Sequence, residues 1–221
     1  PMGIKSESTQ SLREEERAVL KEKRRGEILK AAMPLCLSKG IANVDMKEIA
    51  AAAQVSRATL YRYFPSMKDL VFALLRYQAE ANSSGYDTEM QVFQGNGYAK
   101  FNQFVDQLVD AYHQFPDFFR FMGMIDFYYG SEELVDLYQD LFRGLLLEDT
   151  PHLYLEEGQT DGSVRTDIEP RLYTASVIAT LVSLSEQMAS NQETTRRLYG
   201  QENLGIMIET IAEALLRAIK P

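Results

Sequence analysis

The 221-residue sequence has little of what marks secreted or membrane proteins. Its one cysteine, Cys36, cannot form an internal disulfide, so we expect a reducing, cytoplasmic location. The longest apolar run, near residues 177–184, falls short of the ~18 residues that suggest a membrane helix, and no signal-peptide core opens the sequence. We therefore expect no membrane association. The 45% apolar and 25% charged residues are typical of a globular protein.

The sequence also lacks a recognisable catalytic or metal-binding constellation. Its two histidines, His113 and His152, and Cys36 have no metal-ligand spacing. Residues 161–167 superficially resemble a calcium loop, but Arg165 places a cation where a ligand oxygen is needed. There is no glycine-rich phosphate loop and no plausible pair of a nucleophile and its base. We therefore expect neither enzymatic activity nor a cofactor or metal.

Basic residues are scarce overall, with a net charge of −9, but they gather near the N-terminus. Residues 1–82 carry 14 basic and 10 acidic residues, a net of +4, whereas residues 83–221 carry 9 and 22, a net of −13. A basic segment attached to an acidic body is expected when one end of a protein contacts nucleic-acid phosphates. The same charge runs would also suit a solvated helix face, so charge alone leaves both alternatives open.

Apolar residues recur with helical periodicity along the chain, and no useful β-alternation occurs, so an all-α fold is predicted. Asp45 and Glu48 form a capping-box pattern, and Ser56 and Ser66 are placed to cap the next two helices. Pro34 should kink the first helix. Residues 157–167 are predicted to be a loop. About nine helices are expected, near residues 28–39, 46–53, 57–64, 67–82, 98–115, 118–129, 132–147, 171–188 and 204–219.

Residues 46–64 have the pattern of a helix-turn-helix: a short helix, a three-residue turn and a second short helix. Ala50 is small where the two helices would touch, and the shared core would be filled by Ile49, Ala53, Val55 and Leu60. The second helix would expose cations and hydroxyls, which bind phosphates and base edges. The alternative is a solvated helical hairpin without a DNA-binding role.

Residues 24–70 resemble the DNA-binding domain of TetR-family transcriptional regulators. The resemblance rests on Ile49-Ala50, Val55-Ser56, Thr59-Leu60-Tyr61, Phe64 and Asp69-Leu70. It implies an N-terminal three-helix helix-turn-helix domain, residues 1–82, and a larger helical effector-binding and dimerisation domain, residues 83–221. Gln54 stands where the family usually has glycine, so we expect either a strained backbone at Gln54 or a slightly different turn.

The resemblance and the helix pattern together identify candidate DNA-binding residues. Arg57, Ala58 and Thr59 would lie nearest the bases in the major groove, while Tyr61, Tyr63 and Lys68 would bind phosphates. The complete set is Lys47, Arg57, Ala58, Thr59, Tyr61, Arg62, Tyr63 and Lys68. The segment before Lys21 could follow the minor groove, but glutamates at 14–16 disfavour this.

An aromatic-rich region of the second domain is the candidate effector site, because aromatic side chains line adaptable apolar pockets well. Its alternative is an ordinary hydrophobic core. The expected effector is small and hydrophobic or aromatic, and carboxylates such as Asp126 favour a cationic one. The candidate lining residues are Phe104, Leu108, Tyr112, Phe121, Phe127, Tyr138 and Phe142.

Two late helices, near 171–188 and 204–219, have small apolar faces that could form a four-helix interface between two chains. The alternative is that they complete the core of one chain. The candidate interface residues are Ala175, Ile178, Ala179, Val182, Ile208, Ile211 and Leu215. These features predict a homodimeric repressor that leaves its double-stranded DNA operator when it binds a small molecule. The alternative is a small-ligand carrier or sequestering protein that has lost DNA binding.

Overall fold

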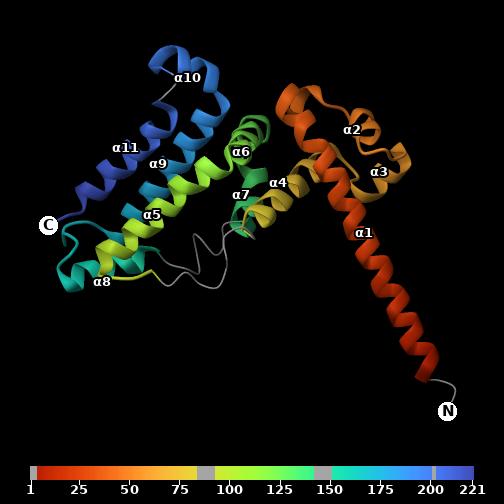
Figure 1. Cartoon of the computed structure of the whole chain (residues 1–221), viewed down its shortest axis with the longest axis horizontal. Helices are drawn as coiled ribbons and strands as arrows, with labels where there is room; N and C mark the ends of the chain where they lie inside the picture. Colours follow the sequence, from red (N-terminus) through yellow and green to blue (C-terminus); the bar gives the residue numbers. More distant parts are fainter. Residues whose placement is uncertain (1–3, 84–92, 142–150, 201–202) are drawn as a thin grey trace. The chain divides into compact units, whose positions relative to one another are not determined.

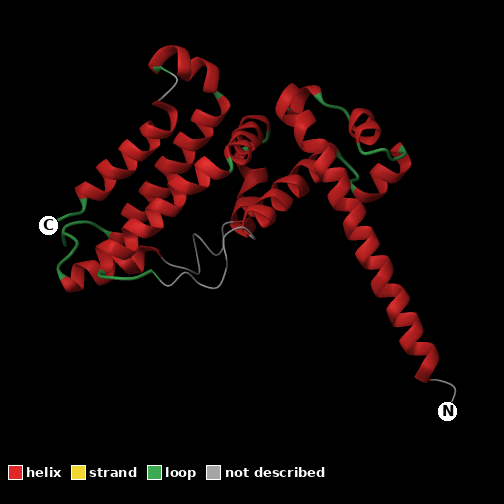
Figure 2. Ribbon diagram, in the orientation of Figure 1, coloured by secondary structure: helices red, strands yellow, loops and turns green. Residues whose placement is uncertain are grey.

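The computed structural model describes residues 4–83, 93–141, 151–200 and 203–221 (Figure 1). All regular elements in these ranges are helical, and they contain no strand (Figure 2). The predicted all-α class is therefore confirmed. The described residues form eleven α-helices and one short 3-10 helix, two α-helices more than the sequence pattern predicted.

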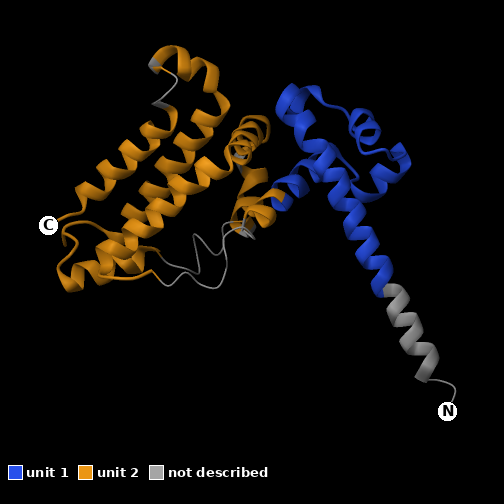
Figure 3. Cartoon of the chain, in the orientation of Figure 1, with its two compact units in different colours: residues 1–77 blue, residues 78–221 orange. Residues whose placement is uncertain are grey.

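The chain divides into two compact units, residues 1–77 and 78–221 (Figure 3). The sequence assigned residues 1–82 to DNA binding and residues 83–221 to effector binding and dimerisation, and this assignment of functions stays a prediction. The N-terminal unit contains α1 (Ile4–Lys39), η1 (Ile41–Asn43), α2 (Met46–Ala52), α3 (Arg57–Tyr63) and the first part of α4 (Met67–Ser83). Its core includes Ile28, Ile49, Leu60 and Leu70, none of which is exposed to solvent.

The helix starts in the N-terminal unit follow the capping residues identified in the sequence. Asp45 and Glu48 form the predicted capping box: Asp45 Oδ1 accepts a hydrogen bond from the Glu48 N–H at 2.8 Å, and Glu48 Oε2 accepts one from the Asp45 N–H at 3.3 Å. Ser56 Oγ accepts from the Thr59 N–H at 3.0 Å, and Ser66 Oγ accepts from the Asp69 N–H at 3.1 Å. Local chemistry therefore fixes where α2, α3 and α4 begin.

Gln54, in the turn between α2 and α3, has a strained backbone, one of the two expected outcomes. Its φ is +53°, and among the described residues no other non-glycine residue has a positive φ. This conformation costs an L-residue roughly 1–2 kcal/mol, whereas glycine adopts it without a steric penalty.

Replacing Gln54 with glycine should therefore raise the free energy of unfolding by about 0.5–1 kcal/mol, since relief of strain exceeds the entropy that glycine adds to the unfolded chain. Gln54→Val, with a β-branched side chain at the same φ, should lower it. Urea titration of the three proteins measures both changes. If the glycine variant is less stable than the wild type, the backbone at Gln54 is not strained.

The C-terminal unit is a helical bundle in which α5, α9 and α11 run side by side, with α8 across the end of α5 (Figure 1). Phe101, Leu155, Val177 and Ile208 are fully buried among these helices. The helices are α5 (Gly97–Gln114), α6 (Pro116–Tyr128), α7 (Ser131–Leu141), α8 (Pro151–Asp161), α9 (Pro170–Ser190), α10 (Gln192–Tyr199) and α11 (Asn203–Ala218).

The prediction of a loop over residues 157–167 was wrong in its first part, because α8 continues to Asp161. Gly158 suggested a turn in the sequence, but it is a helical residue, and a Cβ atom built on it would lie 2.4 Å from Val164 Cγ2, so it makes room for the segment that follows α8. The close approach of α5 to α8 depends on Gly97, the first residue of α5. A Cβ atom built on Gly97 would lie 2.1 Å from the Gly158 nitrogen and 2.3 Å from the Tyr154 carbonyl oxygen. The α10 helix was also missed, because its polar sequence QETTRRLY offers few apolar residues to reveal a period.

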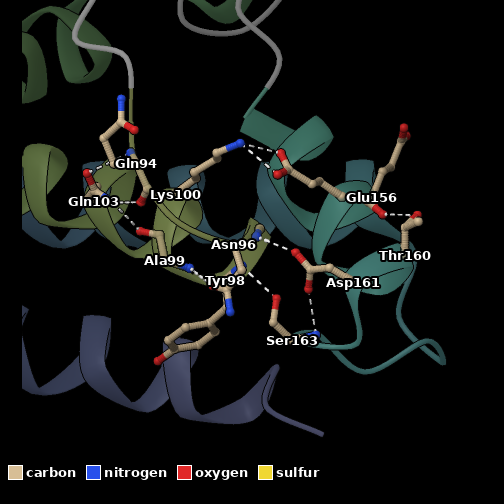
Figure 4. Close-up of polar contacts among 12 residues, drawn as sticks. Gln94, Asn96, Tyr98, Ala99, Lys100, Gln103, Glu156, Thr160, Asp161 and Ser163 are labelled. Atoms are coloured by element: carbon tan, nitrogen blue, oxygen red, sulfur yellow. Dashed lines mark hydrogen bonds and ion pairs between the residues drawn. The ribbon is translucent and has the colours of Figure 1, made fainter.

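The segment from Asp161 to Asp167 holds the start of α5, through Asp161 and Ser163 (Figure 4), and also contacts the residue that follows α11. Asp161 Oδ2 accepts from the Gly97 N–H at 2.8 Å, and Ser163 Oγ accepts from the Tyr98 N–H at 3.1 Å, so both bind the start of α5. The Arg165 N–H donates to the Ile219 carbonyl at 2.9 Å, just after α11. These residues therefore have a structural role, and the Gly97 N–H holds the pKa of Asp161 below its ordinary value.

Candidate DNA-binding surface and effector region

The α3 helix presents a polar face because its apolar residues point inward. Leu60 is fully buried and Phe64 is 2% exposed, which turns the intervening positions outward. Tyr61 is 49% exposed. The other exposed candidates are Arg57, Ala58 and Arg62 on α3 and Lys47 on α2. These five residues are accessible to a nucleic acid, as the sequence predicted for a recognition helix.

Three further candidates are half-buried and have partners within the unit. Thr59 Oγ1 accepts a hydrogen bond from Ser56 Oγ at 2.9 Å. The ring of Tyr63 lies 5.8 Å from the Arg62 guanidinium carbon. On α4, Lys68 Nζ lies 5.3 Å from the Phe72 ring centre. Thr59 therefore supports the start of α3, and its contact with bases stays a prediction.

Basic residues of α1, which the candidate set omits, also lie beside this surface. Arg24 Nη2 donates to the Gln54 carbonyl in the α2–α3 turn at 3.4 Å, and the Arg25 guanidinium lies 5.6 Å from the Phe64 ring centre. The sequence offered one signal for these positions, the basic run at residues 23–25. It could not show which residues they contact, because contacts between residues 30 or more positions apart are decided by tertiary folding.

Most of the aromatic candidates for the effector region are buried. Phe104 and Tyr112 belong to the hydrophobic core of the C-terminal unit, and Leu108 packs against it. Phe121 is also fully buried, but it is not part of that core cluster. Tyr138 is half-buried, and Phe142 lies outside the described residues. The structure therefore brings some of the predicted lining residues together, but not all.

Phe127 does not line the interior of this chain, which corrects the sequence prediction. Its side chain is 95% exposed, whereas Ile125 and Phe121 are fully buried. Successive helical residues are about 100° apart, so Phe127 lies on the opposite side of α6 from Ile125. The aromatic residues Phe119 and Phe121 in the first half of α6 are buried, whereas Phe127 and Tyr128 near its end are exposed, a difference that aromatic composition alone does not reveal.

Two carboxylates and a tyrosine hydroxyl meet where α6, α7 and α9 pack. The Tyr138 hydroxyl donates a hydrogen bond to Asp126 Oδ1. Glu186, on α9, is half-buried, and its burial together with the nearby Asp126 carboxylate raises its pKa to about 7. Partial burial also raises the Asp126 pKa, and the hydrogen bond from Tyr138 opposes that rise. Glu186 was absent from the candidate set, since nothing in its sequence position indicates proximity to Asp126.

This raised pKa predicts an unusual pH dependence of stability. The folded chain holds a proton on Glu186 that the unfolded chain releases near pH 4.5, so the free energy of unfolding should fall as the pH rises from about 4.5 to about 7. Glu186→Gln should therefore match the wild type at pH 5 and exceed its stability by about 1–2 kcal/mol at pH 8, allowing for solvent screening.

Urea titrations at the two pH values measure this difference. Asp126→Asn, which removes the neighbouring carboxylate and retains Glu186, should show a smaller loss of stability between pH 5 and pH 8 than the wild type. Equal differences between the Gln variant and the wild type at both pH values would contradict the assignment.

The α9 and α11 helices carry the predicted interface residues, and the structure divides them into two groups. Ala175 and Ala179 are exposed, Ile211 is 38% exposed, and Val182 and Leu215 are half-buried. Ile178, at 9% exposed, and Ile208, fully buried, belong to the chain's own core, which corrects their assignment to an interface. These two face α5 and its neighbours, because they lie on the inner sides of their helices.

No helix in the described part of the chain is long and apolar enough to cross a membrane. Within the same residues, no group of three or more His, Cys, Asp or Glu side chains is arranged to hold a metal ion. His113 contacts Glu209 instead, with 3.1 Å between Nε2 and Oε1, and Cys36 is buried, which raises its thiol pKa to about 11.

Comparison with known proteins finds a family match in the N-terminal unit and solved structures with a similar fold. Residues 28–74 match the family described as bacterial regulatory proteins, tetR family. The chain is similar in structure to the transcriptional regulator FadR from Bacillus subtilis in complex with stearoyl-CoA, at 16% identity, with a TM-score of 0.64 over 87% of this chain and 98% of that one. No curated protein matches the chain.

Two further solved structures have similar folds. A TetR transcription regulator from Haloarcula marismortui is 18% identical, with a TM-score of 0.64, covering 90% of this chain and all of that one. A tetR-family regulatory protein from Rhodococcus RHA1 is 16% identical, with a TM-score of 0.65, covering 90% of this chain and 97% of that one.

Proposed function

Because residues 28–74 match the tetR family of bacterial regulatory proteins, we propose that the chain is a member of that family and a homodimeric repressor that a small molecule releases from its DNA operator. Regulators of this type are not enzymes, and the proposal assigns no enzymatic activity to this chain. The observation that carries the proposal is the exposed polar face of α3, with Arg57, Tyr61 and Arg62 outward and Leu60 buried behind them. This is the arrangement in which a recognition helix enters the major groove.

For the effector, we favour a hydrophobic or aromatic compound with a cationic group. Phe104, Leu108 and Tyr112 offer apolar surface in the C-terminal unit. Ionised Asp126 would attract a cation and repel phosphate groups, and Glu186 would strengthen both effects above its pKa of about 7. The similar Bacillus protein was solved with stearoyl-CoA, whose phosphates would be disfavoured next to these carboxylates, so the acidic pair argues for a different effector class here.

Binding to DNA as a dimer would use the exposed small residues of α9 and the outer side of α11, around Ala175, Ala179 and Ile211. Small side chains let helices from two chains approach closely. A two-fold interface would place two α3 helices on successive major grooves, about 34–36 Å apart. The transmitted signal would pass along α4, which is covalently continuous from the N-terminal unit into the C-terminal one.

The DNA-binding surface is tested by two substitutions on α3. Tyr61→Phe should weaken binding to all duplexes alike, by about 1 kcal/mol per chain, because one phosphate hydrogen bond is lost. Arg62→Ala should also change which sequences are preferred. Both are measured by enriching duplexes from a random library and titrating each variant against them. Unchanged affinity and unchanged preference in both variants would contradict the assignment of α3.

Release by a ligand is tested by a thermal-shift screen of planar hydrophobic compounds, in cationic and neutral pairs. A binder that acts as the effector should lower operator affinity about 5–150-fold, and operator DNA should weaken its binding equally. A compound that stabilises the protein without changing operator affinity would favour the alternative function, a small-ligand carrier that has lost DNA binding.

A further inference from the structure

The first helix is much longer than the region that matches the family. It runs from Ile4 to Lys39, whereas the family match begins at residue 28. Residues 15–22 are exposed, including Val19 at 67% and Leu20 at 65%. An exposed helical extension is only marginally stable in water by itself, so contact with a binding partner would stabilise it. The residues on its faces indicate which partner.

A row of cations follows one face of this extension. Arg17, Lys21 and Arg24 are spaced at i, i+4 and i+7, so they lie one above another on the helix. Ile28, four residues further on, continues the same row and is fully buried in the N-terminal unit. We call Arg17, Lys21 and Arg24 the basic stripe. It is therefore the outward continuation of the face by which α1 packs onto the helix-turn-helix.

The acidic residues of the extension lie off this face. Glu22 pairs with Arg25 at 3.1 Å, and Glu15 and Glu16 precede Arg17 by about 200° and 100° around the helix. In the described part of the chain, no hydrogen bond or ion pair engages Arg17 or Lys21, while Arg24 pairs with Glu27 at 2.7 Å. Two of the three stripe cations are thus available to an anionic partner.

One contact joins the basic stripe to the DNA-binding surface. Arg24 Nη2 reaches the carbonyl of Gln54, in the turn that immediately precedes α3. The stripe therefore lies on the side of α1 where the helix-turn-helix has its turn, and from Arg24 to Arg17 it extends the basic surface of that unit along α1 by about 10 Å.

We propose that Arg17 and Lys21 bind the phosphates of DNA flanking the sequence that α3 contacts, so that the extension lengthens the DNA site on each side. The proposal rests on the proposed DNA-binding function. An α-helix is 10–12 Å wide and does not fit the minor groove, which is about 6 Å wide. The helical structure of this segment thus favours contact with the phosphate backbone over the minor-groove path considered from the sequence.

The extension offers a matched pair of substitutions. Lys21 and Lys23 are both exposed lysines, but two residues rotate the helix by about 200°, so Lys23 faces away from the stripe. The experiment compares wild type, Lys21→Gln, Lys23→Gln and the double variant Arg17→Gln/Lys21→Gln. Circular dichroism confirms that the variants are folded. The DNA sequence for the probes is enriched from a random library by binding to the wild type. It is used as two duplexes, one trimmed to the enriched site and one with ten additional base pairs on each side.

Lys21→Gln should reduce the slope of log affinity against log salt by about 0.9 for each chain bound, since one phosphate contact is lost, and the double variant by about twice that. Lys23→Gln should leave the slope as in the wild type. The additional base pairs should strengthen binding of the wild type and of Lys23→Gln, but not of the double variant.

The outcomes separate this proposal from the proposed function. If the wild type binds no duplex, the DNA-binding function itself is overturned, and the flanking contact with it. If the wild type binds but Lys21→Gln and Lys23→Gln have equal slopes, only the flanking contact is overturned. A change of oligomeric state on deletion of residues 2–20, with an unchanged slope, would instead assign the extension to contact between chains and also overturn the proposal.

Discussion

Gly97→Ala should lower the free energy of unfolding of the chain by about 3 kcal/mol or more. The first residue of α5 meets the middle of α8 backbone to backbone, where an added Cβ would lie 2.1 Å from the Gly158 nitrogen and 2.4 Å from its Cα. Because backbone atoms surround the site, no side-chain rotation can relieve the overlap, and α5 must shift as a whole. That shift would also break the hydrogen bond from the Gly97 N–H to Asp161.

The natural control is Gly130→Ala, in the turn between α6 and α7. A Cβ built on Gly130 meets no atom within 4 Å, so this variant should unfold close to the wild-type urea midpoint. Equilibrium urea titration monitored by far-ultraviolet circular dichroism resolves a difference in stability of this size. Equal stability of Gly97→Ala and Gly130→Ala would show that α5 and α8 do not cross in close contact.

The second large effect is expected from Ala179→Arg, which should convert the proposed dimer into a monomer and weaken operator binding more than 100-fold. Ala179 is exposed on α9, so arginine fits the isolated chain without a clash. In a dimer it would place a charged side chain in a surface of small residues, and its partner copy would do the same. A monomer loses the gain of two linked half-sites, typically 10²–10⁴-fold.

Light scattering gives the oligomeric state, and operator titration gives the affinity. Thr166→Arg is the matched control, because it adds the same charge at an exposed position in the segment between α8 and α9. The control should remain dimeric and bind the operator normally. A dimeric Ala179→Arg with wild-type affinity would place the interface elsewhere, and a monomeric wild type at micromolar concentration would refute the dimer.

The N-terminal unit was predictable because its determinants are local. Asp45, Ser56 and Ser66 start helices through hydrogen bonds to residues three positions away, and these patterns are visible in the sequence. The positive φ of Gln54 was one of two outcomes expected from the resemblance, because Gln54 stands where the TetR family usually has glycine. The outward direction of Tyr61 and Arg62 followed from the buried positions of Leu60 and Phe64 beside them. The sequence by itself therefore determined the helix-turn-helix and its exposed residues.

The C-terminal unit was decided by contacts between residues far apart in the sequence. Composition could not show that Phe127 faces outward and Phe121 inward, or that Ile178 and Ile208 fill the chain's own core, because several helices compete for each apolar face. Nor could it show that Glu186 approaches Asp126 from 60 residues away. Helix formation depends on neighbours within one turn, whereas burial and electrostatics depend on which helices pack together, and only the tertiary structure decided that.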